Sequence, residues 1–318
     1  DSDRLVHIAT DGETYGHHHR FGEMALAYAL ERIDSLPDTR LTNYGEYLSR
    51  HPPQHEALIY ENSSWSCAHG VERWRSDCGC NTGRGWHQRW RAPLRSSLER
   101  LKAEPDAPSR RRGLELSQQP MQALDGYISV ILERTEPRLH EFLARHCKPE
   151  ALQNDEGRIR ALQLLEMQRH GTLMFTSCGW FFDEISGLEP TQILLYAARA
   201  LQLADSNAPL RGKALEKELL EGLALAPSNV EQHRDGANYW RKTIAPAVVD
   251  LPRVLAHQAM LCLFPEAANG HKLYCYDRID QSQDSESLGR SRLVLGRLSL
   301  RSRITLERAD AVFASLYI

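Results

Sequence analysis

The apolar residues near the amino terminus fall into short runs separated by a helical pattern. Residues 5–10 and 57–60 are compact apolar stretches without alternation, which is typical of strands covered on both faces in a parallel sheet. Between them, residues 21–33 are rich in helix formers, with apolar side chains three or four positions apart. This order of strand, turn and helix predicts a parallel α/β arrangement.

A long helical region follows a polar segment at residues 104–112. That segment contains prolines and three consecutive arginines, and it predicts a solvated linker at a domain boundary. Beyond it, apolar residues recur at helical spacing over residues 121–145, 158–173, 193–203, 215–225 and 230–264. Because no repeat length joins these segments, the pattern predicts a helical bundle rather than a solenoid.

The period shortens again after Gly270. Alternating apolar and polar residues, typical of half-buried antiparallel strands, occupy residues 272–276, 292–295, 297–300, 303–306 and 311–316. The polar residues 280–287 between them predict a mobile loop.

Length supports a division into several units, since 318 residues exceed the usual size of one domain. We expect an α/β region over residues 1–104, a helical domain over residues 105–265 and the start of an antiparallel β domain over residues 266–318.

Composition excludes several classes of partner. The hydrophobic fraction of 42% and the charged fraction of 25% are those of an ordinary globular protein. A net charge of −3 argues against a nucleic-acid partner. The best apolar run, residues 173–182, is too short for a bilayer and is broken by Gly179, so we expect no membrane partner. Seven cysteines, an odd count, fit reduced thiols in a cytoplasmic protein.

An acidic turn follows the first predicted strand. Asp11 lies where that strand ends, and the carboxyl ends of parallel strands form the ligand face of α/β folds. Asp11, Glu13 and His17 together could hold a divalent ion that activates water, as in a metal-dependent deacetylase or hydrolase. As an extended pair, the two carboxylates are about 6.6 Å apart along the chain, which is loose for a retaining glycosidase.

Cysteines and histidines gather after the second predicted strand. Cys67, His69, Cys78 and Cys80 can close a tetrahedral zinc site, although their one-residue gaps are shorter than those of zinc ribbons. Alternatively, these cysteines are thiols that pack in the protein interior without a metal. We expect the protein to bind no cofactor. Trp65 and Trp74 lie in the same stretch, where they serve either as stacking faces for a sugar or as core anchors.

A family resemblance rests on residues 11–23, with the sequence Asp-Gly-Glu-Thr-Tyr-Gly-His-His-His-Arg-Phe-Gly-Glu. This stretch resembles the fourth sequence motif of glycoside hydrolase family 57, retaining α-glucan-active enzymes built on an incomplete (β/α)7 barrel. Residues 61–80 are similar to an uncharacterised bacterial branch whose members carry a long domain of unknown function after the barrel. The resemblance implies that residues 1–104 are the later part of such a barrel, with Asp11 as general acid/base and with Glu13 and His17 as substrate-binding neighbours.

The helical region carries a weaker match. Residues 174–184 resemble the fifth family motif, in which an aromatic side chain reaches the substrate cleft. The resemblance implies that Trp180 stacks on a sugar and that Asp183 replaces the family's aspartate, which Cys178-Gly179-Trp180 displaces.

The family's nucleophile is a glutamate in a motif that precedes the aspartate, and this chain has only ten residues before Asp11. The resemblance therefore implies that the nucleophile and the N-terminal half of the barrel lie upstream, and that the chain alone is inactive. We expect the full protein to hydrolyse or transfer chains of an oligo- or polysaccharide. Two alternatives stay open: a non-catalytic carbohydrate-binding or regulatory protein, and the metal-dependent enzyme described above.

Overall fold

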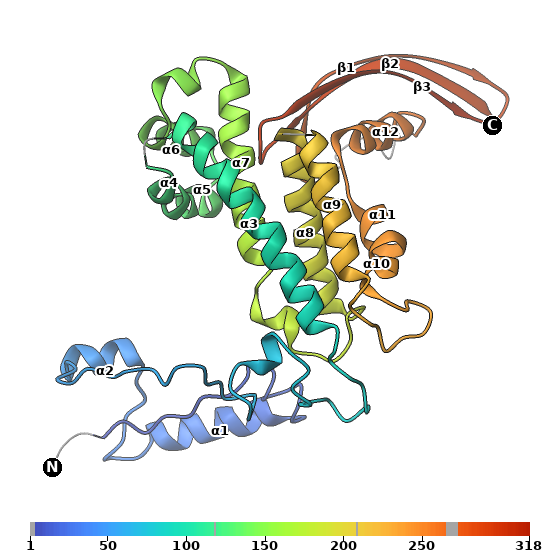
Figure 1. Cartoon of the computed structure of the whole chain (residues 1–318). Coiled ribbons are helices and arrows are strands. Elements are labelled where there is room, and N and C mark those ends of the chain that lie inside the picture. Colours follow the sequence, from blue (N-terminus) through green and yellow to red (C-terminus); the bar gives the residue numbers. More distant parts are fainter. Residues whose placement is uncertain (1–3, 118, 208, 265–272) are drawn as a thin grey trace. The chain divides into compact units, whose positions relative to one another are not determined.

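The computed structural model describes residues 4–117, 119–207, 209–264 and 273–318 (Figure 1). The chain divides into two compact units, Asp1–Glu61 and Asn62–Ile318, here called unit 1 and unit 2. Among the described helices, none combines the length and apolar character that crossing a membrane requires.

Unit 1 contains two helices joined by irregular chain. Helix α1 (Gly22–Asp34) lies where the sequence predicts it, and α2 (Tyr44–Arg50) begins at Asn43, whose side chain accepts a hydrogen bond from the backbone N–H of Glu46 at 2.9 Å. No described residue of this unit is buried. Its helices therefore present their apolar side chains to solvent.

The predicted strands at residues 5–10 and 57–60 are not formed, so the described part of residues 1–104 gives no evidence for the predicted barrel. The only pairing described there is an isolated bridge between Tyr15 and His19. An apolar run forms a strand when a neighbouring strand satisfies its backbone N–H and C=O groups, and unit 1 supplies no such neighbour within its described residues.

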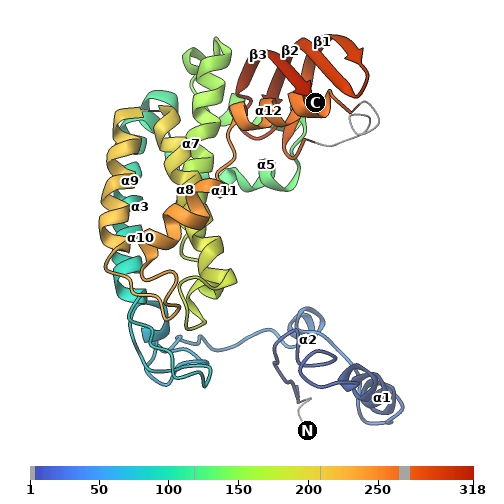
Figure 2. The same cartoon turned by 90° about the vertical axis from the view of Figure 1, so that its right-hand side faces the viewer.

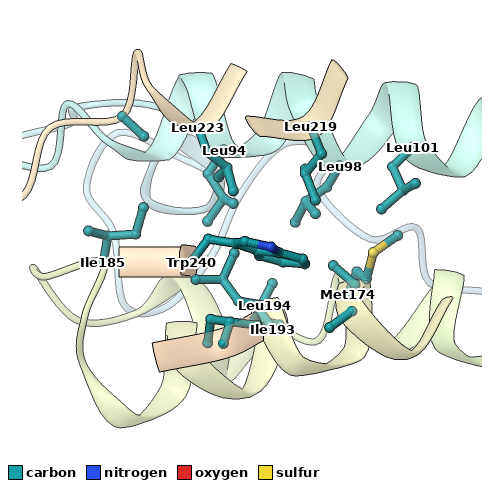
Figure 3. Close-up of a cluster of buried hydrophobic side chains, with 14 of the residues drawn as sticks. Leu94, Leu98, Leu101, Met174, Ile185, Ile193, Leu194, Leu219, Leu223 and Trp240 are labelled. Carbon is teal, nitrogen blue, oxygen red and sulfur yellow. The ribbon is translucent and has the colours of Figure 1, made fainter. Parts of the chain in front are cut away.

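Unit 2 is built on four long helices, α3 (Arg91–Leu116), α7 (Asp155–Leu173), α8 (Leu188–Asn207) and α9 (Pro209–Leu223). They pack side by side (Figure 1, Figure 2). Leucines 94 and 98 of α3, Ile193 of α8 and Leu219 of α9 meet in one apolar core with Trp240 (Figure 3). The predicted helical bundle is confirmed.

The predicted linker at residues 104–112 is wrong, because these residues lie inside α3. Arginine, leucine, glutamate and alanine surround the prolines, and their helix propensity favours continuing the helix.

Shorter elements complete the helical part. Residues 121–145, predicted as one helix, form α4 (Pro120–Gly126), α5 (Ile128–Leu132) and α6 (Glu136–His146), which share a second core. Short 3-10 turns are η1 (Glu72–Trp74), η2 (Pro149–Leu152) and η3 (Ser177–Trp180). Residues 230–264 form α10 (Gly236–Tyr239), the π-helical turn η4 (Trp240–Ile244), α11 (Ala245–Ala247) and α12 (Leu251–Leu261).

The chain ends in a three-stranded antiparallel sheet, in the order β1 (Tyr276–Leu288), β2 (Ser291–Ser302), β3 (Arg308–Tyr317). Val254 and Leu255 of α12 pack on Leu298 and Leu300 of β2. The predicted antiparallel region is confirmed, except that residues 303–306, predicted as a strand, lie in the turn between β2 and β3. The predicted mobile loop at residues 280–287 is part of β1. Its backbone pairs with β2, and this pairing does not require apolar side chains.

Candidate functional site

The acidic motif of unit 1 is a series of backbone-bonded turns. The N–H of Thr14 donates to the carbonyl of Asp11 at 3.1 Å, and the N–H of His18 donates to the carbonyl of Glu13 at 2.9 Å. Gly16 has a φ of 103°, in the left-handed region that favours glycine, and a Cβ there would lie 3.3 Å from the Glu23 carboxylate. The motif therefore folds locally, without a strand before it.

The side chains of Asp11, Glu13 and His17 are exposed. Within the described residues, these three are not among the His, Cys, Asp and Glu groups gathered closely enough to hold a metal ion. Their geometry gives no support to the metal-dependent alternative.

The Cys/His cluster of unit 2, defined as Cys67, His69, Cys78 and Cys80, brings its four ligand atoms within 4.8 Å of one another. The Sγ of Cys67 lies 3.9 Å from the Sγ of Cys80 and 4.0 Å from the Nδ1 of His69. The Sγ of Cys80 lies 3.4 Å from that Nδ1. Cys67 is buried, Cys78 and Cys80 are half-buried, and His69 is exposed.

Two glycines shape the turns that carry these ligands. Gly79, between Cys78 and Cys80, has a φ of 80°, and Gly70, directly after His69, has a φ of 75°. A Cβ on Gly70 would also lie 2.2 Å from the carbonyl oxygen of Asn62. Gly79 lets the chain bend between Cys78 and Cys80, whereas Gly70 bends it directly after the Cys67–His69 pair.

Hydrogen bonds and buried cations surround the cluster. Burial raises the pKa of the Cys67 thiol, but hydrogen bonds from the backbone of His69 and Arg73 and from the side chains of His69 and Cys80 lower it to about 7. Burial raises the pKa of the Cys78 thiol. Arg91, which is fully buried, directs its Nη1 to the Sγ of Cys78 at 3.7 Å.

The cluster is fastened to the segment at residues 177–184. The Nη2 of Arg91 donates to the carbonyls of Phe181 and Phe182 at 3.1 and 3.0 Å, and the Nη1 of Arg73 donates to that of Phe181 at 3.1 Å. Gln88 completes the connection by donating to the Cys80 carbonyl at 3.2 Å and to the Asp183 carboxylate at 3.1 Å.

Trp180 and Asp183, predicted to bind substrate, are both buried. Trp180 is 0% exposed and its indole stacks with the rings of Trp90 and Phe175, so the side chain is closed to solvent in this structure. Asp183 is buried and accepts hydrogen bonds from the backbone N–H and the hydroxyl of Thr82 at 2.7 and 2.6 Å. Residues 181–183 thus supply the carbonyl and carboxylate oxygens that bind the side chains of Arg73, Gln88 and Arg91 beside the Cys/His cluster.

Trp65 and Trp74, the other two tryptophans predicted to bind a sugar, lie in different environments. The indole N–H of Trp74 donates to the carbonyl of Ser177 at 3.1 Å, which favours the anchoring interpretation. Trp65 is 84% exposed and keeps an open face for a ligand.

Several important residues escaped prediction. Arg73, Arg91 and Gln88 are buried polar side chains that hold the cluster, and Glu184 is a buried carboxylate that accepts from Ser228 at 2.6 Å and from the backbone N–H of Asn229 at 2.7 Å. Although burial raises the pKa of Glu184, these hydrogen bonds bring it below its ordinary value. The only available hint was the density of arginine and tryptophan around the cysteines.

A cavity of about 550 Å³ lies between α8, α9, α12 and the start of the sheet. Its lining is mixed: apolar side chains such as Leu201, Trp240 and Leu251 lie beside polar and charged ones, which include Arg199, Gln202, Asp205, Lys213, Glu216 and Glu307. The Oδ1 atom of Asp205 is buried without a hydrogen-bond partner.

Comparison with protein families gives one match. The model of a family described as a domain of unknown function (DUF3536) matches residues 86–318. No curated protein and no solved structure matches the chain. The matched residues begin after the Cys/His cluster and include most of unit 2.

Proposed function

Because the chain belongs to the family described as a domain of unknown function (DUF3536), we propose a function from the motif that precedes the matched residues. The chain supplies the acid/base segment of a retaining, family 57-like glycoside hydrolase or glucanotransferase that acts on α-glucans. Asp11 is the general acid/base. The nucleophilic glutamate belongs to an N-terminal barrel half of the same protein.

The observation that carries this proposal is the exposure of the two apolar runs of unit 1. Val6 is 91% exposed and Leu58 is 98% exposed, in segments whose length and composition suit buried strands. Contiguous apolar side chains in water are unfavourable by about 0.8 kcal/mol per CH₂ group relative to burial. The runs are therefore suited to pair with strands of the proposed N-terminal barrel half, which would order them on either side of the Asp11 motif.

The proposed chemistry follows from the turn that carries the motif. The carbonyl of Asp11 accepts a backbone hydrogen bond within a short turn, so the position of its Cα is fixed by the turn. Its side chain is exposed. It would protonate the departing glycosidic oxygen while the glutamate nucleophile, about 5–5.5 Å away, forms the glycosyl-enzyme bond. Asp11 would then deprotonate the water or the acceptor hydroxyl that releases the sugar. Glu13 and His17 would contact sugar hydroxyls.

The test is Asp11→Asn in a protein that also carries the proposed N-terminal barrel half. We expect kcat on an α-glucan to fall about 10²- to 10⁴-fold with little change in KM, because a general acid acts in the transition state. Asp34→Asn, at the exposed end of α1, is the matched control and should leave kcat unchanged. Equal rates for Asp11→Asn and the parent protein would refute the proposal, and loss of activity in chelator would favour the metal-dependent alternative.

The cavity of unit 2, with its mixed polar and apolar lining, favours non-catalytic carbohydrate binding as a second candidate. Its lining offers carboxylate, amide and guanidinium groups, which are the partners of sugar hydroxyls, and Asp205 has an unsatisfied buried oxygen. In the same experiments, oligosaccharide binding that survives Asp11→Asn but is lost in Asp205→Asn would favour this function.

A further inference from the structure

We propose that Cys67, His69, Cys78 and Cys80 bind one zinc ion, and that the ion has a structural role. The proposal goes beyond the catalytic function above, since it concerns unit 2 alone and none of its ligands is part of the Asp11 motif.

The spacing of the ligand atoms fits a tetrahedral ion. With zinc–sulfur bonds of about 2.3 Å and zinc–nitrogen bonds of about 2.0–2.1 Å, two sulfurs are held about 3.8 Å apart, and a sulfur and a nitrogen about 3.6 Å apart. The Sγ atoms of Cys67 and Cys80 are 3.9 Å apart, and these atoms lie 4.0 and 3.4 Å from the Nδ1 of His69. Cys78 completes the set within 4.8 Å, so small side-chain rotations suffice to close the site.

The donor set selects the ion and its role. Three thiolates and one imidazole are soft ligands that zinc binds in closed four-coordinate sites, which are structural because no position is left for water or substrate. A disulfide would need sulfurs about 2.05 Å apart, and the cysteines of the cluster are free.

Buried cations balance the charge of such a site. Three thiolates and a neutral imidazole around Zn²⁺ carry a net charge of −1. Arg91 is fully buried and directs its Nη1 to the Sγ of Cys78 at 3.7 Å, while Arg73 is buried next to the ligand loop. A buried guanidinium needs a negative partner, and a metal-bound thiolate at Cys78 is one.

The ion would hold the beginning of α3 against the segment at residues 177–184. Arg91 is the first residue of α3, and with Arg73 and Gln88 it joins the ligand loop to Phe181, Phe182 and Asp183. Zinc fixes the two ligand turns relative to each other, so its removal should loosen this attachment while the bundle core, centred on Leu94, Leu98 and Trp240, stays packed.

The experiment measures metal in the full chain, purified without a polyhistidine tag and without chelator. We expect about one zinc per chain by plasma mass spectrometry, and after exchange with Co²⁺ the charge-transfer and d–d bands of tetrahedral thiolate-bound cobalt. In Cys80→Ser the zinc content should fall at least fivefold. Cys178→Ser, which changes an exposed cysteine outside the cluster, should retain it. Replacing His17, His18 and His19 together by Ala tests whether the zinc is bound at the exposed histidines of unit 1 instead of at the cluster. This variant should also keep its zinc content unchanged.

The cobalt spectrum is measured on the parent protein, so it tests the proposal even where Cys80→Ser does not fold. The proposal is overturned by zinc well below one per chain, by an octahedral cobalt spectrum, by loss of zinc in the triple histidine variant, or by an intact mass that reveals a disulfide in the freshly purified chain. Failure here leaves the Asp11 proposal untouched, because the kinetics of Asp11→Asn do not depend on this site.

Discussion

Glu166 on α7 is a carboxylate buried among hydrogen-bond donors. It accepts from the hydroxyl of Tyr127 at 2.6 Å, from Arg134 at 2.9 Å and from Arg169 at 3.1 Å. Burial raises the pKa of Glu166, but these partners bring it below its ordinary value. Arg134 lies between α5 and α6 and also donates to the carbonyl of Ile304 at 3.1 Å. The network therefore joins these helices to the turn between β2 and β3.

We predict that Glu166→Gln destabilises the protein by about 1–3 kcal/mol, since a neutral amide at this buried position cannot compensate the half-buried guanidinium groups of Arg134 and Arg169. Urea unfolding measures the loss. Glu141→Gln, which removes an exposed carboxylate paired with Arg138 and Arg145, should cost less than about 1 kcal/mol. Equal effects of the two substitutions would contradict the assigned role of Glu166.

The same group predicts a dependence on pH. Because the pKa of Glu166 is depressed in the folded state, its contribution to stability is present above the carboxyl pKa of the unfolded chain and is lost as pH falls through the lower, folded value. The stability of Glu166→Gln should lack this component, so the difference between the two proteins should shrink as the solution is acidified.

At the scale of residues, the sequence identified which side chains could bind a metal or a sugar, but it did not reveal which of them are buried. It singled out the four residues of the Cys/His cluster by type, and the structure brings their ligand atoms together. It assigned Trp180 and Asp183 to a substrate cleft, although both are buried, because an aromatic side chain beside a carboxylate looks the same in a cleft and in a core.

At the scale of elements, two glycines of α7 stand in opposite environments. A Cβ at Gly157, in the first turn, would lie 1.8 Å from the carbonyl oxygen of Ala151 in η2. A Cβ at Gly171, near the other end, would meet only the Cγ of Lys102 at 4.0 Å. The absence of a side chain at Gly157 lets the backbone of η2 approach the helix. At Gly171 no neighbouring backbone lies close enough to require glycine.

We therefore predict opposite signs for the two alanine substitutions. Gly157→Ala should destabilise the protein by about 1–3 kcal/mol, because the η2 backbone must move. Gly171→Ala should stabilise it by about 0.5–1 kcal/mol through helix propensity. Thermal unfolding followed by circular dichroism compares them directly, and a stabilised Gly157→Ala protein would show that η2 does not pack as described.

The strand β1 illustrates what periodicity misses. Its residues are mostly polar and exposed, so no alternation distinguished residues 280–287 from a loop. Pairing with β2 decides its conformation, and that pairing is a property of the neighbouring strand.

At the scale of the whole molecule, the two units differ in how they are stabilised. Unit 2 contains several apolar cores, whereas no described residue of unit 1 is buried. Burial of apolar surface is the main favourable contribution to the free energy of folding. Because unit 1 lacks a buried core among its described residues, we expect it to unfold more readily than unit 2.

We predict that limited proteolysis of the chain cuts first within residues 4–61 and leaves a stable product that begins near Asn62. This product should unfold in one cooperative transition with a midpoint close to that of the whole chain. Mass spectrometry of the product and its thermal unfolding supply the measurements. A protease-resistant unit 1, or a product of unit 2 that aggregates, would contradict this division.

The sequence by itself determined the helical bundle, the antiparallel end of the chain and the residues able to bind a metal, because helical periodicity, alternation and ligand chemistry are local properties. Only the tertiary structure decided that residues 5–10 and 57–60 form no strands, that residues 104–112 continue a helix, and that Arg91 faces a cysteine. These outcomes depend on which distant groups satisfy the backbone and cover the side chains, and that information lies in no single stretch of the chain.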